Sequence, residues 1–327
     1  MAARDTEPYL EECLQSILGQ TYPQWELIAI NDHSVDRTGE ILHAYASRDK
    51  RIRVINSRRE KLIPALKEGY ALRRGMLINR MDSDDRMPAD KLEVMVRHWL
   101  LHGRGTIIAG GTEHFVDQGE VGPGFRRYEN WLNDLAARGA HYEEIYQECV
   151  IPSHCWMMHH LDFEAVGGFE PEVYPEDYDL CFRFYQAGYQ VVGLNKILHY
   201  WRDRAERISR TWEVYKDNRY FELKLHYFYL LDRDLRRPLV IWGAGRNGKD
   251  LTKLILNNEK NLHWICDNKK KIGKDIYGIR MQHFDELISI DAPQILIAVA
   301  SPDDRREIKS HLKQNGKKPV SDFWFFS

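Results

Sequence analysis

Short apolar runs alternate with segments of helical periodicity through the first third of the chain, and this alternation limits the fold more than any other feature. The apolar runs are WELIAI, RIRVIN and MLINRM, at residues 25–30, 51–56 and 76–81. Between them, apolar side chains recur every three or four residues, as at Leu10, Leu14 and Ile17. Such alternation predicts an α/β domain with a mostly parallel sheet flanked by helices.

Acidic clusters directly follow two of these predicted strands. NDHSVD (31–36) follows the first apolar run, and DSDD (82–85) follows the third. Because parallel sheets bind ligands at the carboxyl ends of their strands, Asp32, Asp82 and Asp84 are expected to share one rim. Carboxylates on a loop suit Mg²⁺ or Mn²⁺, which bridges them to substrate phosphates; Asp84 is the expected metal ligand, with Asp82 nearer a ribose. The alternative is a solvated acidic turn before the helix that begins near Pro88.

A third acidic group precedes a predicted helix further along the chain. Glu176, Asp177 and Asp179 stand at the start of a helix beginning near Tyr178. Acidic residues in a first turn also complement the helix dipole, and Asp179 fits that role. Glu176 and Asp177 follow Pro175 in an aromatic, partly buried segment, so they remain candidates for chemistry.

Together these motifs resemble family 2 glycosyltransferases of the GT-A fold. The resemblance covers about residues 4–210 and rests on EPYLEECLQSILGQTYPQWELIAINDHSVD, MDSDD and GGFEPEVYPEDYDL, in the family's order. It implies transfer of a sugar from a nucleotide sugar to an acceptor hydroxyl, with inversion at the anomeric carbon. The favoured donor is a UDP-sugar, and the expected acceptor is a cell-surface glycan or its lipid-linked precursor.

The resemblance also implies roles for individual residues. Asp32 contacts the nucleobase, Asp82 lies near the ribose, and Asp84 binds the metal. Asp177 is the catalytic base and Glu176 lies beside it on the acceptor. A single displacement needs one base opposite the leaving diphosphate, and two separated acidic sites match that requirement.

Two departures from the family pattern stand near the N-terminus. Asn31 and His33 occupy positions where the family usually has Asp and Gly, so the pocket for the base is expected to differ. Only MAARD precedes the first predicted helix, whereas the family opens with a strand of about five apolar residues. Either the sequence starts late or the first strand is truncated, and a truncated strand is the expectation.

Composition excludes several classes of protein. A net charge of −2 predicts no nucleic-acid partner. Five cysteines without a C-x-x-C pair indicate reduced thiols. Without an apolar run of about 18 residues or a signal peptide, the sequence predicts a cytoplasmic protein, with a peripheral contact at the inner membrane face as an option.

Histidines and arginines supply further candidates. His154 and His199 are expected to be packed structural residues, with a role at the acceptor or metal site as the alternative. Arg202, Arg207 and Arg210 are candidates for clamping a diphosphate.

Residues 211–236 are predicted to form one linking helix rich in aromatic and basic side chains. Such a helix packs two domains together or lies on an anionic membrane surface, which would suit a lipid-linked acceptor.

A smaller Rossmann-like unit is predicted at residues 237–327. Gly243, Gly245 and Gly248 form a G-x-G-x-x-G fingerprint between a strand and a helix, and Asp267 ends the next strand. A P-loop is excluded because Asp250 occupies the position of the required Ser or Thr. The unit resembles the nucleotide-sugar-binding domain of sugar acyltransferases; docking or oligomerisation is the alternative role.

The resulting prediction is a metal-dependent, inverting glycosyltransferase domain at residues 1–210, followed by the linking helix and the Rossmann-like accessory domain. Two alternatives remain open. One is a non-catalytic nucleotide-sugar-binding or scaffold protein, and the other is an NAD(P)-binding oxidoreductase that acts through the C-terminal unit.

Overall fold

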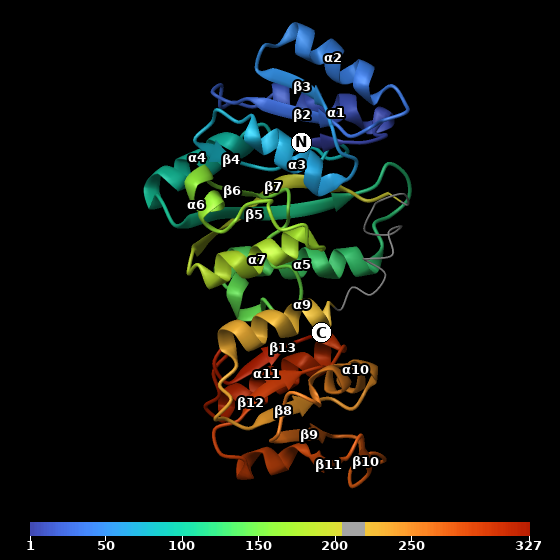
Figure 1. The fold of residues 1–327 in the computed structure, drawn as a ribbon, viewed down its shortest axis with the longest axis vertical. Helices are drawn as coiled ribbons and strands as arrows, with labels where there is room; N and C mark the ends of the chain where they lie inside the picture. Colours follow the sequence, from blue (N-terminus) through green and yellow to red (C-terminus); the bar gives the residue numbers. More distant parts are fainter. Residues whose placement is uncertain (205–219) are drawn as a thin grey trace. The chain divides into compact units, whose positions relative to one another are not determined.

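The computed structural model describes residues 1–204 and 220–327, which form two compact units (Figure 1). Of these residues, the first unit holds 1–141 and 150–204, and the second holds 142–149 and 220–327. Residues 205–219, which include the first part (211–219) of the segment predicted as a linking helix, lie outside the described residues.

The first unit alternates strands with helices, as its periodicity predicts. Its strands are β1 (Ala2–Ala3), β2 (Leu27–Asn31), β3 (Ile52–Asn56), β4 (Leu77–Ile78), β5 (Thr106–Phe115), β6 (Trp156–His159) and β7 (Gln190–Arg202). Its helices are α1 (Glu7–Leu18), α2 (Thr38–Arg48), α3 (Leu62–Ala71), α4 (Lys91–His102), α5 (Pro123–Arg138), α6 (His160–Ala165) and α7 (Glu176–Gln186). A 3₁₀ helix, η1 (His141–Glu144), follows α5, and all of it except His141 belongs to the second unit.

Two sheets organise the first unit. β1, β2 and β3 form a parallel sheet in that order. The second sheet has the order β4-β6-β5-β7, in which β6 runs antiparallel to both neighbours while β5 and β7 pair in parallel. The sheets are therefore mostly parallel, and β6 supplies the antiparallel component of this mixed α/β architecture.

The apolar faces predicted from helical spacing do form the core. Leu10, Leu14 and Ile17 of α1 are buried in one cluster with residues of α2 and β2. Burying such a side chain stabilises the fold by about 1.5–3 kcal/mol. The helical periodicity in the sequence therefore identified the face of α1 that packs on the sheet.

The first strand is short. β1 has two residues, and Ala2 and Ala3 pair in parallel with Ile30 and Asn31. A cavity of about 460 Å³ lies nearby, with Met1, Ile30, Ile78 and Met81 among its lining residues.

The second unit begins with α9 (Phe221–Tyr227), which passes into a short π-helix, η3 (Phe228–Asp232). Its strands are β8 (Leu239–Trp242), β9 (Leu262–Cys266), β10 (Asp275–Ile276), β11 (Ile279–His283), β12 (Gln294–Ile297) and β13 (Phe323–Phe325). Its other helices are α10 (Arg246–Ile255), the 3₁₀ helix η4 (Phe284–Ser289) and α11 (Pro302–Gln314).

The sheet of the second unit has the strand order β10-β11-β9-β8-β12-β13. From β11 to β13 the neighbours are parallel, and β10 is added antiparallel at the edge. Numbered in chain order without β10, the five parallel strands follow 3-2-1-4-5, the order of a Rossmann-type sheet. The sequence predicted the strands β8 and β9 but missed β11 and β13, because IRMQH has only two apolar residues and FWF is only three residues long.

His141, which follows α5, connects burial with acid stability. Burial and, to a smaller extent, the positive charge of Arg138 together lower the pKa of His141 to about 4. An unfolded histidine has a pKa near 6.5, so below that pH the unfolded chain binds a proton that the folded protein excludes. The stability that depends on a neutral His141 is therefore fully present above pH 6.5 and is lost as the pH falls towards 4.

We expect His141→Leu to weaken this acid sensitivity. Between pH 7 and pH 5 the wild type should lose about 2 kcal/mol more unfolding free energy than the variant, since one pKa unit corresponds to about 1.4 kcal/mol. Urea unfolding at the two pH values measures the difference. Identical losses in both proteins would contradict a neutral buried His141.

Candidate functional site

Asp32 lies directly after β2, at the carboxyl end of the strand. Its side chain is buried, and both carboxylate oxygens accept from the backbone N–H of Lys61 at 3.3 Å. Burial raises the pKa of Asp32, while the Lys61 hydrogen bond and the charge of Arg4 lower it. The carboxylate is therefore held in place by backbone at a strand end, a position suited to contacting a ligand.

The neighbouring turn has an unusual backbone. His33 adopts φ 58° and Lys61 adopts φ 106°, both in the left-handed region that favours glycine. A histidine at position 33 therefore carries a side chain where a glycine would fit more easily.

Asp82 and Asp84 lie in the loop after β4, and each is paired with an arginine. Arg80 Nε donates to Asp82 Oδ1 at 2.9 Å, and Arg204 Nε donates to Asp84 Oδ2 at 2.7 Å. Both side chains remain partly exposed, at 27% and 14%. The crowded carboxylates noted in the sequence are thus compensated by guanidinium groups contributed from two sides.

Arg80 joins this loop to the predicted catalytic segment. Its Nη1 donates to Glu176 Oε1 at 2.8 Å while its Nε holds Asp82. Burial by itself lowers the pKa of Arg80, but the charges of Asp82 and Glu176 outweigh burial and raise it above the ordinary value. Sequence reasoning missed this residue, although a lone cation between an apolar strand and an acidic cluster was a usable signal.

Glu176 and Asp177 are the first two residues of α7. The helix begins two residues earlier than expected, after Pro175, and places both carboxylates in its first turn. Asp177 is half-buried and accepts from the N–H of Tyr178 at 2.9 Å. Arg80, Glu176 and Asp177 line one small pocket. The structure therefore brings the Asp82 loop and the α7 carboxylates together through a single arginine.

The charges of both Asp32 and Glu176 act on the hydroxyl of Tyr174. Burial raises the pKa of the Tyr174 hydroxyl, and the charges of Glu176, Glu172 and Asp32 contribute in the same direction. Asp32 and Glu176 thus both lie within electrostatic reach of one tyrosine. No direct hydrogen bond joins Asp32 to Asp82 or Asp84 among the contacts of the described residues.

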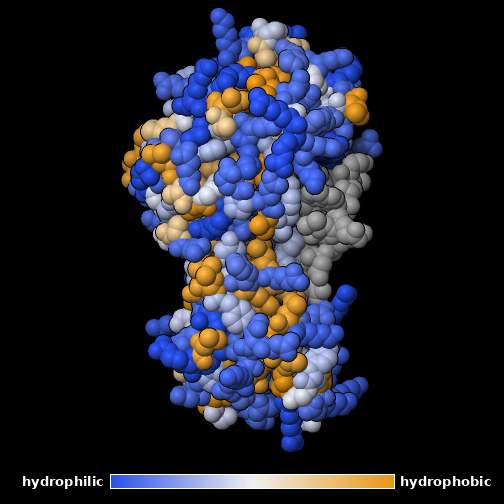
Figure 2. All heavy atoms as spheres, in the orientation of Figure 1, coloured by the Kyte–Doolittle hydropathy of each residue, from blue (hydrophilic) through white to orange (hydrophobic). Residues whose placement is uncertain are grey.

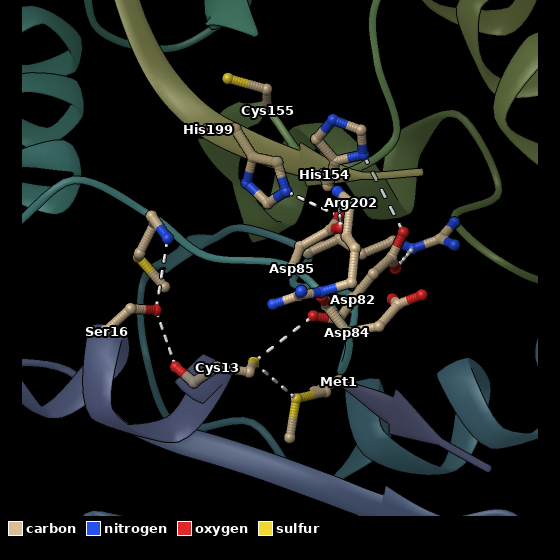
Figure 3. A network of polar contacts seen from close by, with 12 residues as sticks. Met1, Cys13, Ser16, Asp82, Asp84, Asp85, His154, Cys155, His199 and Arg202 are labelled. Carbon is tan, nitrogen blue, oxygen red and sulfur yellow. Dashed lines mark hydrogen bonds and ion pairs between the residues drawn. The ribbon is translucent and has the colours of Figure 1, made fainter. Parts of the chain in front are cut away.

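Asp85, the last acid of the cluster, faces His199 (Figure 3). It is 1% exposed and accepts from His199 Nε2 and from the backbone N–H of Arg202, both at 2.8 Å. Arg202 Nε also donates to the Asp84 carbonyl oxygen at 2.7 Å. Asp85 therefore fastens the end of β7 to the acidic loop.

The protonation of His199 follows from its two partners. Lys91 Nζ lies 3.1 Å from His199 Nδ1 and donates to the His154 carbonyl oxygen at 2.7 Å. A protonated lysine only donates, so Nδ1 accepts, and the ring proton sits on Nε2 and faces Asp85. Burial lowers the pKa of Lys91, while the charge of Asp85 raises it.

Asp85, His154 and His199 have ligand atoms within 4.8 Å of one another, close enough for a metal ion. However, Lys91 brings an ammonium group to His199, and both ring nitrogens of His199 are engaged. A cation would have to displace these contacts. The cluster is better described as a buried network that supports the loop, which agrees with the expectation that His154 and His199 are packed residues.

Two further observations concern the sequence candidates and the surface. Arg207 and Arg210 lie outside the described residues, whereas Arg202 is buried in the network above.

Among residues 1–204 and 220–327, the structure contains no helix with the length and apolar character needed to cross a bilayer. Apolar surface gathers at the edge of the first unit where α4 lies (Figure 2), and Leu100 and Leu101 of α4 are exposed.

Comparisons with known proteins place the chain among glycosyltransferases. The chain is 26% identical to the glycosyltransferase GlyA of Streptococcus pneumoniae over 223 residues, which cover 64% of this chain and 30% of GlyA. Among solved structures, TarS of S. aureus in complex with UDP aligns with a TM-score of 0.50 at 15% identity, covering 71% of this chain and 65% of TarS. The mannosyltransferase PcManGT of Pyrobaculum calidifontis in complex with GDP-Man and Mn²⁺ aligns with a TM-score of 0.50 at 16% identity, covering 78% of this chain and 66% of PcManGT.

These matches differ in what they establish. At such low identity the two structures show the fold alone, which is GT-A. The chain spans less than two thirds of the length of each of these three proteins. The model of the family "Glycosyl transferase family 2" matches residues 1–167, which is just over half of the chain. The chain belongs to glycosyl transferase family 2.

Proposed function

We propose that this protein is an inverting, metal-dependent glycosyltransferase that moves a sugar from a nucleotide-diphosphate sugar to an acceptor hydroxyl during cell-surface glycan synthesis. The observation that carries the proposal is the position of Arg80 between Asp82 and Glu176. It links the loop suited to the donor with the carboxylates suited to the acceptor. A UDP-sugar is the favoured donor, and a glycan or lipid-linked sugar is the proposed acceptor.

Asp177 is the proposed catalytic base, with Glu176 beside it on the acceptor side. In a single displacement, the acceptor oxygen bonds to the anomeric carbon as the bond to the diphosphate oxygen breaks. Asp177 takes the acceptor hydroxyl proton during this step. Glu176 is bound to Arg80, so its position and that of Asp82 depend on the same guanidinium. Asp32 is the proposed contact for the nucleobase.

The residues around Asp84 fit a divalent cation. Asp84 and Asp82 offer oxygen ligands on a partly exposed loop, the ligand type that Mg²⁺ and Mn²⁺ prefer. Asp84 is the proposed metal ligand, and the Arg204 guanidinium occupies one of its oxygens at 2.7 Å. When bound, the ion stabilises the negative charge that develops on the leaving diphosphate. Arg204 and the cation therefore compete for Asp84.

This competition predicts opposite effects of two substitutions on metal affinity. Asp84→Asn should weaken Mn²⁺ binding at least about tenfold, because it removes a charged oxygen ligand. Arg204→Gln should strengthen Mn²⁺ binding, because the ion no longer displaces a guanidinium. Titration of free Mn²⁺ by electron paramagnetic resonance, without nucleotide, measures both. Asp90→Asn, on an exposed residue paired with Lys196, is the control. Unchanged Mn²⁺ affinity in Asp84→Asn would remove Asp84 from the metal site.

A donor screen tests the proposed activity as a whole. UDP-, GDP- and dTDP-sugars are incubated with the protein and Mn²⁺, and release of nucleoside diphosphate is measured. We expect release from a UDP-sugar. Binding of nucleotide sugars without release, with and without oligosaccharide acceptors, would favour a non-catalytic binding protein instead.

The proposed domain organisation is a glycosyltransferase domain at residues 1–210, a linking helix at 211–236 and an accessory domain at 237–327. The parallel strand order of the second unit supports the last of these. The likeness of this unit to the nucleotide-sugar-binding domain of sugar acyltransferases, and a peripheral membrane contact through the basic segment Arg202–Arg237, belong to the same proposal. Co-sedimentation with anionic vesicles tests the membrane contact, and its absence would exclude it.

A further inference from the structure

The second unit contains a cavity at the place where Rossmann-type sheets bind ligands. The connections from β8 and from β12 leave in opposite directions along the sheet, so a crevice opens outside the carboxyl ends of these two strands. A cavity of about 590 Å³ lies there, lined from β8 to α10 by Trp242–Asn247 and after β12 by Ala298–Ser301. Small-molecule sites have about this size.

Each of the three fingerprint glycines meets a different physical requirement of phosphate binding. Gly243 has φ 129°, and a Cβ there would lie 2.9 Å from the Ala298 carbonyl oxygen. A Cβ on Gly248 would lie 1.9 Å from the Gly243 carbonyl oxygen, so only glycine lets α10 pack on the turn. A Cβ on Gly245 would meet no atom within 4 Å, and Gly245 lines the cavity. In a dinucleotide-binding fingerprint, the first glycine permits the tight turn, the second lets a diphosphate approach the backbone, and the third allows close helix packing. Gly243, Gly245 and Gly248 meet these three requirements in that order.

The turn is held rigid before any ligand arrives. Trp264 Nε1 donates to the Gly243 carbonyl oxygen at 2.8 Å, and the Gly243 N–H donates to the Ile265 carbonyl oxygen at 3.0 Å. Gly245 precedes α10 without a side-chain cap, so the first N–H groups of this ten-residue helix face the cavity end. A rigid turn lowers the entropic cost of binding.

Charged side chains divide the cavity lining into three regions. Asp267 follows β9, nineteen residues after Gly248, where an acid accepts from ribose hydroxyls. Lys271 also lines the cavity and its Nζ donates to the Ala244 carbonyl oxygen in the turn, which places a positive charge beside Gly245. Asp304 and Glu307 of α11 line the side next to β12.

We propose that the second unit binds a nucleoside diphosphate whose ribose carries free hydroxyls. Asp267 accepts from the ribose, and the diphosphate lies against Gly245 and the start of α10 beside Lys271. NAD and nucleotide sugars both contain a nucleoside diphosphate with free ribose hydroxyls. Asp304 and Glu307 favour a ligand whose second half is neutral or positive, as the nicotinamide of NAD⁺ is. A ribose with a 2′-phosphate is disfavoured because Asp267 repels it.

Calorimetric titration of the full chain with NAD⁺, NADP⁺ and UDP-glucose, in buffer with EDTA, tests the proposal. EDTA removes the cation on which the donor site of the first unit is proposed to depend. Gly245→Val is the main variant, because its backbone φ of −76° suits valine and its methyl groups enter open cavity space. Asp267→Asn is the second variant. Asp291→Asn is the control, because Asp291 is exposed, precedes the amino-terminal end of β12 and does not line the cavity.

We expect NAD⁺ to bind the wild type and the control equally, and Gly245→Val to weaken binding at least about tenfold. Asp267→Asn should weaken the binding of NAD⁺ and reduce the preference for NAD⁺ over NADP⁺. If UDP-glucose binds in EDTA and is lost in the same variants, the site takes nucleotide sugars and the proposal stands. Binding of neither probe to the wild type, or equal binding to wild type and both variants, would overturn it. The Asp84→Asn variant should bind as wild type does, so failure of the proposed transferase activity leaves this result unchanged.

Discussion

Asp177→Asn is expected to reduce sugar transfer by roughly 10²–10⁴-fold, the range that a general base supplies. Asparagine has the same shape, and its side-chain oxygen can still accept from the Tyr178 N–H. It cannot take the acceptor proton, so the transfer step fails while the fold persists. Affinity for the nucleotide sugar should stay within about threefold, because the Asp82 loop is untouched.

Two measurements separate this effect from general damage. Steady-state transfer assays give the rate, and equilibrium binding of the nucleotide sugar gives the affinity. Glu172→Gln is the matched control, since Glu172 lies in the same segment and forms an exposed ion pair with Arg59. Full transfer activity in Asp177→Asn would remove Asp177 as the base, whatever the behaviour of the control.

Asp85→Ala is expected to destabilise the first unit by about 3–5 kcal/mol, the cost of leaving a buried charge without its partner. The substitution takes away the acceptor for His199 Nε2 and for the Arg202 N–H. It also removes the negative charge that offsets Lys91, which is fully buried beside His199. Donor binding should fall as well, because Asp85 fastens β7 to the loop that carries Asp82 and Asp84.

Urea unfolding followed by circular dichroism measures this loss. Asp134→Ala is the control, since Asp134 forms an exposed ion pair with Arg138 on α5. Exposed pairs contribute about 0–1 kcal/mol, so the control should unfold near the wild type. The loss of unfolding free energy in Asp85→Asn should lie between those of Asp85→Ala and the control, because asparagine keeps one acceptor oxygen. A loss below about 1 kcal/mol in Asp85→Ala would mean that the network does not stabilise the fold.

Elements with strong local patterns could be predicted from the sequence. The run WELIAI covers all of β2 except its last residue, Asn31, and the spacing of Leu10, Leu14 and Ile17 identified the buried face of α1. Both signals arise from side-chain periodicity along a single element, which depends only on nearby residues. The glycine fingerprint between β8 and α10 was recognisable for the same reason.

Partners that are distant in the sequence could not be predicted. DSDD presents neighbouring carboxylates with similar surroundings, yet Asp84 pairs with Arg204 while Asp85 turns inward to His199. That choice depends on where β7 ends, more than a hundred residues later. Arg80 likewise gains its role only when α7 brings Glu176 within 2.8 Å.

The sequence alone therefore determined the α/β class, the acidic strand ends and the types of residue available for chemistry, because these are properties of composition and local periodicity. Only the tertiary structure decided which carboxylate meets which cation. It also placed the cavity of the second unit at the switch between β8 and β12, where the strand order depends on β11 and β13. The physical reason is that pairing and burial of charge depend on distances across the fold, which adjacent residues do not encode.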